Sequence, residues 1–449
     1  MKNKAVKYIL FLIVLALISI GFYFVYKYNT IYPTPLVKEV LIDETGKMTI
    51  KFETDKKPMK NDKIYCGYSI NEEKKEIKWT LADNSECNIE LFQSAKYKIY
   101  LKNEKNDIIY VENSENYGKV LEIRSNKDKI YLAIGGSFTP RLTIKNVGHF
   151  TNNTKWSSEN EKIASVSDNG EIKGISKGNT RVTASIDGKS TTIDVVVTDL
   201  ITTRPKTFNK KKSYLPCDKY NKEENDLLDE ILKDRINDAG YKTRAGVVEA
   251  ARFLALEFPY KIRYFSENGR LATNGVDGEG RYYHTGLYLD ESRFKDIKKS
   301  KYGPQTWGCQ LYSGPSHGKR SNGFDCSGFV SWVLLNGGFD VGDIGAGLAS
   351  HLDLTDYGKR TKTSTDLIKQ KKIKVGDLLS SEGPSGGHIA IIVGEDDNTY
   401  YVAESLWTSP NVAVVIIGYP KKTIFNRYYW VMLMDDYYKE DGNLTSLWY

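Results

Sequence analysis

Residues 323–335 read Gly-Phe-Asp-Cys-Ser-Gly-Phe-Val-Ser-Trp-Val-Leu-Leu, a cysteine placed directly before an apolar run of helical length. This pattern predicts a helix that begins near Cys326. The free amides at a helix N-terminus favour a thiolate, so we expect them to lower the thiol pKa from about 8.5. The small neighbours Ser327 and Gly328 leave room for a carbonyl group, and the backbone N–H of Cys326 or Ser327 is available to an oxyanion. These features predict that Cys326 is an activated nucleophile, and a buried, inert cysteine is the alternative.

A histidine follows in residues 386–394, which read Gly-Gly-His-Ile-Ala-Ile-Ile-Val-Gly. The apolar run predicts a strand, and His388 opens it. The two glycines before His388 leave the imidazole accessible, as a base that faces a cleft requires. Papain-like peptidases place a cysteine at a helix start and a histidine at the start of a later strand. We therefore predict that His388 is the base, and a histidine that only caps the strand is the alternative.

Glu404 is the candidate for a third group that holds the imidazole in place. Residues 389–393 and 399–403 are two apolar-rich runs joined by Gly-Glu-Asp-Asp-Asn, which predicts a hairpin. A loop of odd length places Glu404 directly opposite His388, where the two side chains share a face. A loop of even length places Ser405 there and turns Glu404 to the other face. We predict the first register, with Glu404 orienting the imidazole, and a surface carboxylate is the alternative.

At these residues the chain resembles the NlpC family of cysteine peptidases. The family's Asp-Cys-Ser-Gly-Phe motif lies at 325–329, its Gly-Asp-Leu turn at 376–378 and its Gly-His-x-x-Ile-x-x-Gly strand at 387–394. The resemblance covers about residues 324–434 and implies a papain-like α+β core, in which the helix that bears the cysteine packs on an antiparallel sheet. It also implies hydrolysis of amide bonds in peptidoglycan stem peptides, typically the γ-D-glutamyl bond to a diamino acid, and it implies no cofactor.

The resemblance leaves departures and alternatives. Residues 217–322 fall outside the common motifs, and the family's third site residue, often a histidine or another polar residue, is matched only by Glu404. Among enzymes, the alternative is a CHAP-type amidase or a cross-bridge endopeptidase. From another class, the alternative is a non-catalytic wall-binding surface protein, although the intact Cys326 and His388 argue against it.

An all-β pattern precedes this region, between about residues 122 and 200. The dipeptide Asn169-Gly170 lies between two alternating segments and predicts a hairpin, because both turn positions tolerate positive φ. The region resembles bacterial Ig-like domains of group 2, which implies a spacer or a module that binds wall polymers. Residues 36–119 carry shorter period-two runs that predict a further β-sandwich. The motifs that carry the Ig-like resemblance are Trp-Ser-Ser at 156–158, Ala-x-Val at 164–166, Gly-x-Ile-x-Gly at 170–174 and Gly-x-Thr-x-Val-x-Ala at 178–184.

The N-terminus has the pattern of a membrane anchor. Three lysines, at positions 2, 4 and 7, precede an uncharged apolar run at 8–26. The run approaches the roughly 20 residues that a helix needs to cross a bilayer, and no small-residue cleavage site follows it. Lysines on the short N-terminal side hold that end in the cytoplasm. We therefore expect a single-pass protein of the bacterial cell membrane, with all later domains in the extracytoplasmic wall space.

Five cysteines give an odd count, so at least one thiol has no partner within the chain. Cys66 and Cys87 lie in one predicted β domain and favour a disulfide bond. Cys217 with Cys309 is a weaker pairing, and free structural thiols are the alternative for all four.

The composition excludes some classes of ligand. A net charge of +7 is spread along the chain, which favours a solvated surface, with attraction to an anionic wall polymer or membrane as the alternative. Nucleic acid is not an expected partner outside the membrane. No metal site is predicted, because the chain has no His-Glu-x-x-His and its cysteines lack short paired spacing. The remaining histidines are predicted to be exposed or structural, at His149, His284, His317 and His351.

At 449 residues, the chain is long enough for two to four domains, and its 40% hydrophobic and 27% charged residues are typical of globular proteins. The predicted fold class is multidomain: a single transmembrane helix, two β-sandwich (Ig-like) domains and a C-terminal α+β papain-like peptidase domain. The predicted boundaries are a cytoplasmic tail at 1–7, a transmembrane anchor at 8–26, a β-sandwich at 36–119, an Ig-like domain at 120–199, a linker at 200–215 and the peptidase domain, with a helical N-terminal extension, at 216–449.

Overall fold

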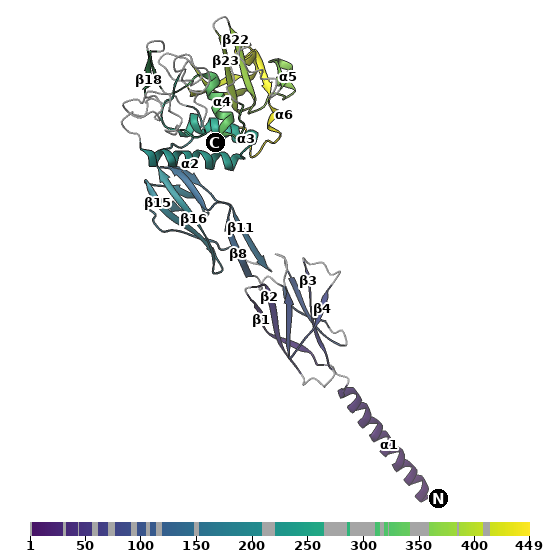
Figure 1. Ribbon diagram of the computed structural model, residues 1–449. Coiled ribbons are helices and arrows are strands. Elements are labelled where there is room, and N and C mark those ends of the chain that lie inside the picture. Colours follow the sequence, from purple (N-terminus) through teal and green to yellow (C-terminus); the bar gives the residue numbers. More distant parts are fainter. Residues whose placement is uncertain are drawn as a thin grey trace. The chain divides into compact units, whose positions relative to one another are not determined.

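The chain forms two compact units (Figure 1). Unit 1 consists of Met1–Ile130, Phe138–Ile172 and Asn179–Val195, and unit 2 of Tyr131–Ser137, Lys173–Gly178 and Val196–Tyr449. The computed structural model describes residues 2–29, 33–43, 45–55, 62–70, 77–90, 97–104, 108–113, 119–147, 152–208, 221–264, 285–287, 310–314, 318–321, 323–341, 359–383, 386–406 and 414–449.

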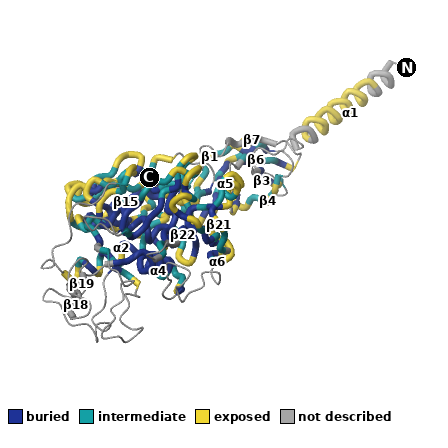
Figure 2. Tube along the Cα trace, turned by 90° about the horizontal axis from the view of Figure 1, so that it is seen from above, coloured by how far each residue is buried: buried dark blue, intermediate teal, exposed yellow. Residues whose placement is uncertain are grey.

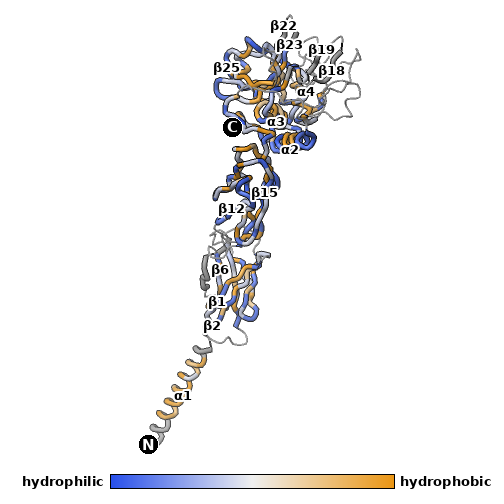
Figure 3. The backbone as a smooth tube through the Cα atoms, turned by 90° about the vertical axis from the view of Figure 1, so that its left-hand side faces the viewer, coloured by the Kyte–Doolittle hydropathy of each residue, from blue (hydrophilic) through white to orange (hydrophobic). Residues whose placement is uncertain are grey.

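The first element is helix α1, Lys2–Asn29. Its large apolar side chains between Ile9 and Val25 are exposed, and Figure 3 colours most of the helix as hydrophobic. Within the described part of the chain, no helix meets both the length and the apolarity needed to cross a membrane. The transmembrane anchor predicted at 8–26 is therefore unsupported by the fold and stays a prediction.

Two sheets pack around one core in the first β region. Alternate residues of β2 point inward, so that Met48, Ile50 and Phe52 are buried. Cys66 on β3 and Cys87 on β5 form a disulfide that joins the two sheets, as their predicted pairing requires. The sheets have the orders β1-β2-β5 and β4-β3-β6-β7, with β1 Pro35–Ile42, β2 Lys47–Thr54, β3 Ile64–Ile70, β4 Lys78–Leu81, β5 Glu86–Glu90, β6 Tyr97–Asn103 and β7 Ile108–Asn113.

The second β region contains the predicted hairpin at Asn169-Gly170. Gly170 has a φ of +82°, and a Cβ there would lie 2.6 Å from the ring of Trp156, so glycine is required on both counts. The turn joins β13, Ala164–Val166, to β14, Ile172–Gly174. The other strands are β8 Lys119–Ser125, β9 Lys129–Ala133, β10 Ser137–Phe138, β11 Leu142–Val147, β12 Lys155–Ser158, β15 Gly178–Ile186 and β16 Lys189–Thr198, in the orders β12-β15-β16-β9, β10-β14-β13 and β11-β8.

Unit 2 opens with two helices that pack on each other, α2 Lys222–Ala239 and α3 Arg244–Arg252. Asn221 caps α2 by accepting the amide N–H of Glu223 at 2.9 Å. The apolar stripe of α2 lies inward, and every residue of α3 is buried. A short π-helix, η3 Phe253–Glu257, continues α3.

A six-stranded antiparallel sheet forms the other layer of unit 2, and α4, Cys326–Asn336, packs on its central strand β23 (Figure 1). Nearly all of α4 is buried (Figure 2). The strand order is β21-β26-β22-β23-β24-β25, with β21 Lys359–Lys362, β22 Leu378–Gly383, β23 Gly386–Glu395, β24 Thr399–Ser405, β25 Val414–Pro420 and β26 Trp430–Leu433. The remaining elements are β17 Arg263–Tyr264, paired in parallel with β20 Gly323–Phe324, then the hairpin β18 Gln310–Gly314 with β19 Gly318–Ser321, and α5 Thr365–Lys369, η6 Lys421–Asn426 and α6 Asp435–Tyr438.

Residues 201–208 of the predicted linker are packed against the helices of unit 2. The amide of Thr202 donates to the carbonyl of Glu257 at 2.8 Å, and the Trp448 indole donates to the carbonyl of Pro205 at 2.7 Å. Arg204 forms ion pairs with the largely buried carboxylates of Glu249 and Glu257. This stretch is therefore an ordered part of unit 2.

Candidate active site

Cys326 begins helix α4, where the sequence predicts a helix start. Asp325 is the N-cap, and its carboxylate accepts the amide N–H of Gly328 at 2.7 Å. The hydroxyl of Ser327 lies 3.4 Å from the same carboxylate. Cys326 is 5% exposed, and it is the free cysteine among the residues that the structure describes.

Burial and, after it, the negative charge of Asp325 raise the pKa of the Cys326 thiol to about 11. The backbone N–H groups of Ile389, Ser327 and Cys326 act in the opposite direction but do not outweigh burial. The predicted lowering of this pKa is therefore wrong. The helix N-terminus does supply hydrogen-bond donors, but the loss of hydration destabilises the thiolate more than these donors stabilise it.

Two contacts place the sulfur next to the start of β23. The amide N–H of Ile389 donates to Cys326, so the sulfur lies beside the backbone of the residue that follows His388. The Tyr264 side chain also hydrogen-bonds with Cys326. Tyr264 reaches this position because β17 pairs in parallel with β20, directly before α4.

His388 and Glu404 are in direct contact. The imidazole Nε2 lies 2.6 Å from Oε2 of Glu404, and the side chains are 15% and 0% exposed. Although burial opposes ionisation, hydrogen bonds from His388, Tyr428 and Tyr419 hold the pKa of Glu404 below its usual value. Glu404 is thus a buried carboxylate that stays charged and binds one nitrogen of the imidazole.

Two tyrosines also bind this carboxylate. The Tyr419 hydroxyl donates to Oε1 at 2.7 Å, and the Tyr428 hydroxyl donates to Oε2 at 2.6 Å. Burial and the charge of Glu404 raise the pKa of Tyr419 to about 12 and raise that of Tyr428 as well, so both hydroxyls remain donors. The ring of Tyr428 also stacks on the imidazole of His388, with the centroids 6.1 Å apart.

The predicted register of the hairpin is wrong, although the predicted contact is present. Strand β23 pairs with β24 through Ile391 opposite Ala403, so Glu404 comes opposite Ala390 and not opposite His388. His388 lies two residues before Ala390 and therefore on the same face, which makes it a diagonal neighbour of Glu404. Ser405, the alternative partner, donates to the carbonyl of Phe324 at 2.8 Å.

The sequence motifs do not indicate a role for Tyr264, Tyr419 or Tyr428. Each lies outside the three motifs, and no local period marks it, because only the fold brings it to Cys326 or Glu404. Among the described residues, no group of His, Cys, Asp and Glu side chains is arranged to hold a metal ion. His149, His284, His317, His351, Cys217 and Cys309 lie outside the described residues.

Comparison with known families decides the class of the C-terminal region. Residues 307–420 match the model of the NlpC/P60 family. This region is an NlpC/P60 domain. Residues 138–196 match the bacterial Ig-like domain (group 2), upstream of the NlpC/P60 domain, so both resemblances seen in the sequence are confirmed. The NlpC/P60 match supports a cell-wall hydrolase of the cysteine peptidase class in general.

Likeness to solved structures is weaker. The S-layer protein rSbsC(31-844) is 16% identical with a TM-score of 0.19, and the match covers 41% of this chain and 28% of that chain. Three N-terminal domains of the bacteriophage RB49 Highly Immunogenic Outer Capsid protein are 11% identical with a TM-score of 0.22, over 37% of this chain and 69% of that chain. TM-scores this low carry no argument about function. No curated protein sequence matches the chain.

Proposed function

We propose that this protein is a peptidoglycan endopeptidase that hydrolyses an amide bond of the wall stem peptides, with Cys326 as nucleophile, His388 as base and Glu404 as the group that orients His388. The observation that carries the proposal is the 2.6 Å contact between His388 Nε2 and Glu404 Oε2. Because Glu404 occupies Nε2, the other nitrogen, Nδ1, is left for proton exchange with the thiol.

The reaction begins with a protonated thiol, since the pKa of Cys326 is raised to about 11. As the sulfur attacks the amide carbon, its proton passes to Nδ1 of His388. The backbone N–H of Cys326 or Ser327 stabilises the oxyanion of the tetrahedral intermediate. The imidazolium then gives its proton to the leaving amine, which breaks the C–N bond. Water, deprotonated by the same imidazole, hydrolyses the thioester and restores the thiol.

Glu404 supports both proton transfers. Its pKa is held low, so it is charged when His388 takes up the proton and it stabilises the imidazolium. The donors Tyr419 and Tyr428 fix the carboxylate in place, which in turn fixes the ring plane of His388. The geometry therefore supplies orientation and charge at a group that must accept and return a proton.

The bond we propose is the γ-D-glutamyl bond to a diamino acid, on the strength of the NlpC/P60 match. A CHAP-type amidase would instead separate sugar from peptide, and a cross-bridge endopeptidase would cut between stems. Digesting purified walls of several chemotypes with the full chain, followed by mass spectrometry of the new termini, distinguishes the three. A free diamino-acid N-terminus supports the proposal, and a free lactyl carboxylate or an opened cross-bridge contradicts it.

Two variants test the nucleophile and its base. Cys326→Ala is expected to abolish release of stem fragments, and His388→Ala is expected to do nearly the same, while far-ultraviolet circular dichroism stays unchanged. Wall hydrolysis that persists in the folded Cys326→Ala protein would rule out the cysteine mechanism.

We further propose that α1 anchors the enzyme in the cell membrane, with the later domains in the wall space and the Ig-like domain acting as a spacer or as a binder of wall polymers. The exposed apolar side chains of α1 and the lysines before them support this proposal. Protease added to intact protoplasts should remove the domains after Lys27. Full protection of these domains would contradict the topology.

A further inference from the structure

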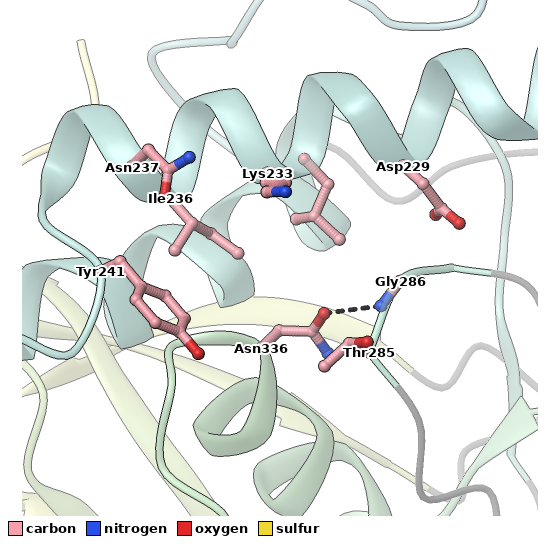
Figure 4. A pocket seen from close by; sticks show the side chains of 9 residues that line it. Asp229, Lys233, Ile236, Asn237, Tyr241, Thr285, Gly286 and Asn336 are labelled. Atoms are coloured by element: carbon pink, nitrogen blue, oxygen red, sulfur yellow. Dashed lines mark hydrogen bonds between the residues drawn. The ribbon is translucent and has the colours of Figure 1, made fainter.

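A pocket of about 490 Å³ lies between α2 and the C-terminal end of α4 (Figure 4). Its size is within the range of sites that hold small organic ligands. Asn336, on its wall, ends α4 and accepts the amide N–H of Gly286 at 2.8 Å. Since Cys326 begins the same helix, the pocket lies about 15 Å from the candidate nucleophile along α4. It is thus separate from the site of bond cleavage.

The lining of the pocket carries no net charge. Asp229 and Lys233 lie one turn apart on α2, and the described residues offer Lys233 no ion pair or hydrogen bond. Asp229 accepts the amide N–H of Leu287 through Oδ1 at 2.6 Å, while Oδ2 accepts no hydrogen bond from the described residues. A simple cation or a simple anion would meet one attracting and one repelling charge, so neither is favoured. The lining therefore suits a ligand without net charge that has both donors and acceptors.

Asp229 can pair with a hydrogen-bond donor or with a hydrogen-bond acceptor of a ligand. Burial, together with the nearby charge of Asp226, raises the pKa of its carboxyl to about 7, although the hydrogen bond from the Leu287 amide opposes the shift. Near neutral pH the group is therefore present both as an acceptor and as a hydroxyl donor. Hydroxyl and amide groups of a ligand can pair with either form.

The middle and far end of the pocket are apolar. Leu232 and Ile236 are buried and line the pocket, and Figure 4 shows Ile236 pointing between Asp229 and Tyr241. Tyr241 lines the end of the pocket opposite Asp229, and the residue is 53% exposed. An exposed tyrosine in a concave site offers a flat apolar face together with a polar tip. A sugar ring has the complementary surface, with C–H groups on its face and hydroxyls at its edge.

We propose that this pocket binds N-acetylated amino-sugar units of the wall glycan strand, and so holds the strand while a stem reaches Cys326. The acetamido group supplies a donor, an acceptor and a methyl group, which match Asp229, Asn237 and the apolar floor. About 15 Å corresponds to four or five extended residues, which is the scale of a stem peptide. The inference rests on the proposed function and extends it from the peptide to the glycan.

Binding of the β-1,4-linked trimer of N-acetylglucosamine to the purified full chain tests the site, by titration calorimetry. The wild-type protein is expected to bind the trimer saturably, and Tyr241→Ala is expected to raise the Kd at least tenfold. Tyr241→Phe, which keeps the ring, should bind within about threefold of wild type. The matched control is Tyr449→Ala, which removes another exposed tyrosine that lies outside the pocket and should leave the Kd unchanged.

Two further outcomes would overturn the inference. One is equal binding of the trimer to wild type and to Tyr241→Ala. The other is binding of free lysine but not of the trimer, which would assign the pocket to a zwitterionic amino acid. A cleavage assay separates this test from that of the proposed function: Tyr241→Ala should cut a sugar-free stem peptide at the wild-type rate but release fragments from intact walls more slowly. If the wild-type protein does not cleave stem peptides at all, the proposed function itself is refuted.

Discussion

At the scale of single residues, the candidate site depends on one buried carboxylate. Glu404 is 0% exposed, yet three hydrogen-bond partners keep it charged. A buried carboxylate without them would take up a proton and lose its attraction for an imidazolium. The residues that hold Glu404 therefore matter to His388 as much as Glu404 does.

Replacing Glu404 with Gln removes the charge while keeping the size of the side chain. We expect kcat to fall by about 10²-fold with little change in KM, because the imidazolium loses its stabilisation while substrate contacts remain. Steady-state kinetics on a stem peptide measures this. Glu395→Gln, which neutralises a carboxylate on β23 that pairs with Lys421, is the control and should keep the wild-type rate. A Glu404→Gln enzyme with wild-type kcat would remove Glu404 from the mechanism.

The raised pKa of Cys326 makes a prediction about pH. A pH of 7 is about four units below the pKa of about 11, so very little thiolate is present. Alkylation by iodoacetamide should therefore be slow at pH 7, and its rate should rise with pH up to about 11. Cys326 is the site to follow, by mass spectrometry of the labelled peptide. A labelling midpoint below about pH 8 would show that the resting site holds a thiolate, and that burial does not dominate.

At the scale of elements, tight turns set the arrangement of the β regions. Gly170 and Gly188 both occupy hairpin turns with positive φ, at +82° and +73°. They differ in their surroundings, because a Cβ at position 170 meets Trp156 at 2.6 Å while nothing lies within 4 Å of one at position 188. Substitution of alanine at position 188 therefore measures backbone strain alone, whereas alanine at position 170 adds a steric clash.

Gly188→Ala should lower the free energy of unfolding of the Ig-like region by about 1 kcal/mol, the cost of a left-handed alanine. Gly170→Ala should cost about 2 kcal/mol or more, because Trp156 must also move. Urea denaturation followed by tryptophan fluorescence measures both values. Equal losses in the two variants would show that the contact with Trp156 contributes nothing.

At the scale of the whole molecule, the two units have cores of their own. The sandwich that contains Cys66 and Cys87 has a core cluster distinct from that of unit 2, which contains Cys326 and His388. Stability changes in the sandwich should therefore leave the chemistry of unit 2 unaffected.

Removing the disulfide tests this independence. Cys66→Ser with Cys87→Ser should lower the free energy of unfolding of the sandwich by about 2–4 kcal/mol, since the reduced chain regains unfolded-state freedom. Calorimetry should show one transition moving to lower temperature, while kcat on a soluble stem peptide stays within twofold. A parallel loss of kcat would contradict the independence of the two units.

Local signals are enough to place the chemical groups on a helix and on a strand. Cys326 at a helix start and His388 on a strand follow from local signals, namely a helical apolar run and a strand-length apolar run. Such signals act within a few residues, so one chain segment is enough to reveal them. The resemblances to NlpC peptidases and to Ig-like domains rest on the same kind of local motif.

The pairing and the charge of these groups depend on contacts between distant segments. The register of β23 on β24 changes at a bulge between Ile392 and Gly394, and Gly394 packs against Trp448 and the carbonyl of Ser446 near the end of the chain. The contact of Glu404 with His388 is present although the predicted register is wrong, because a register shift of two residues keeps both side chains on the same face of the sheet. The pKa of Cys326 was mispredicted for a related reason. A helix N-terminus is a local feature, whereas burial sums over side chains from distant segments, and here burial is the larger effect.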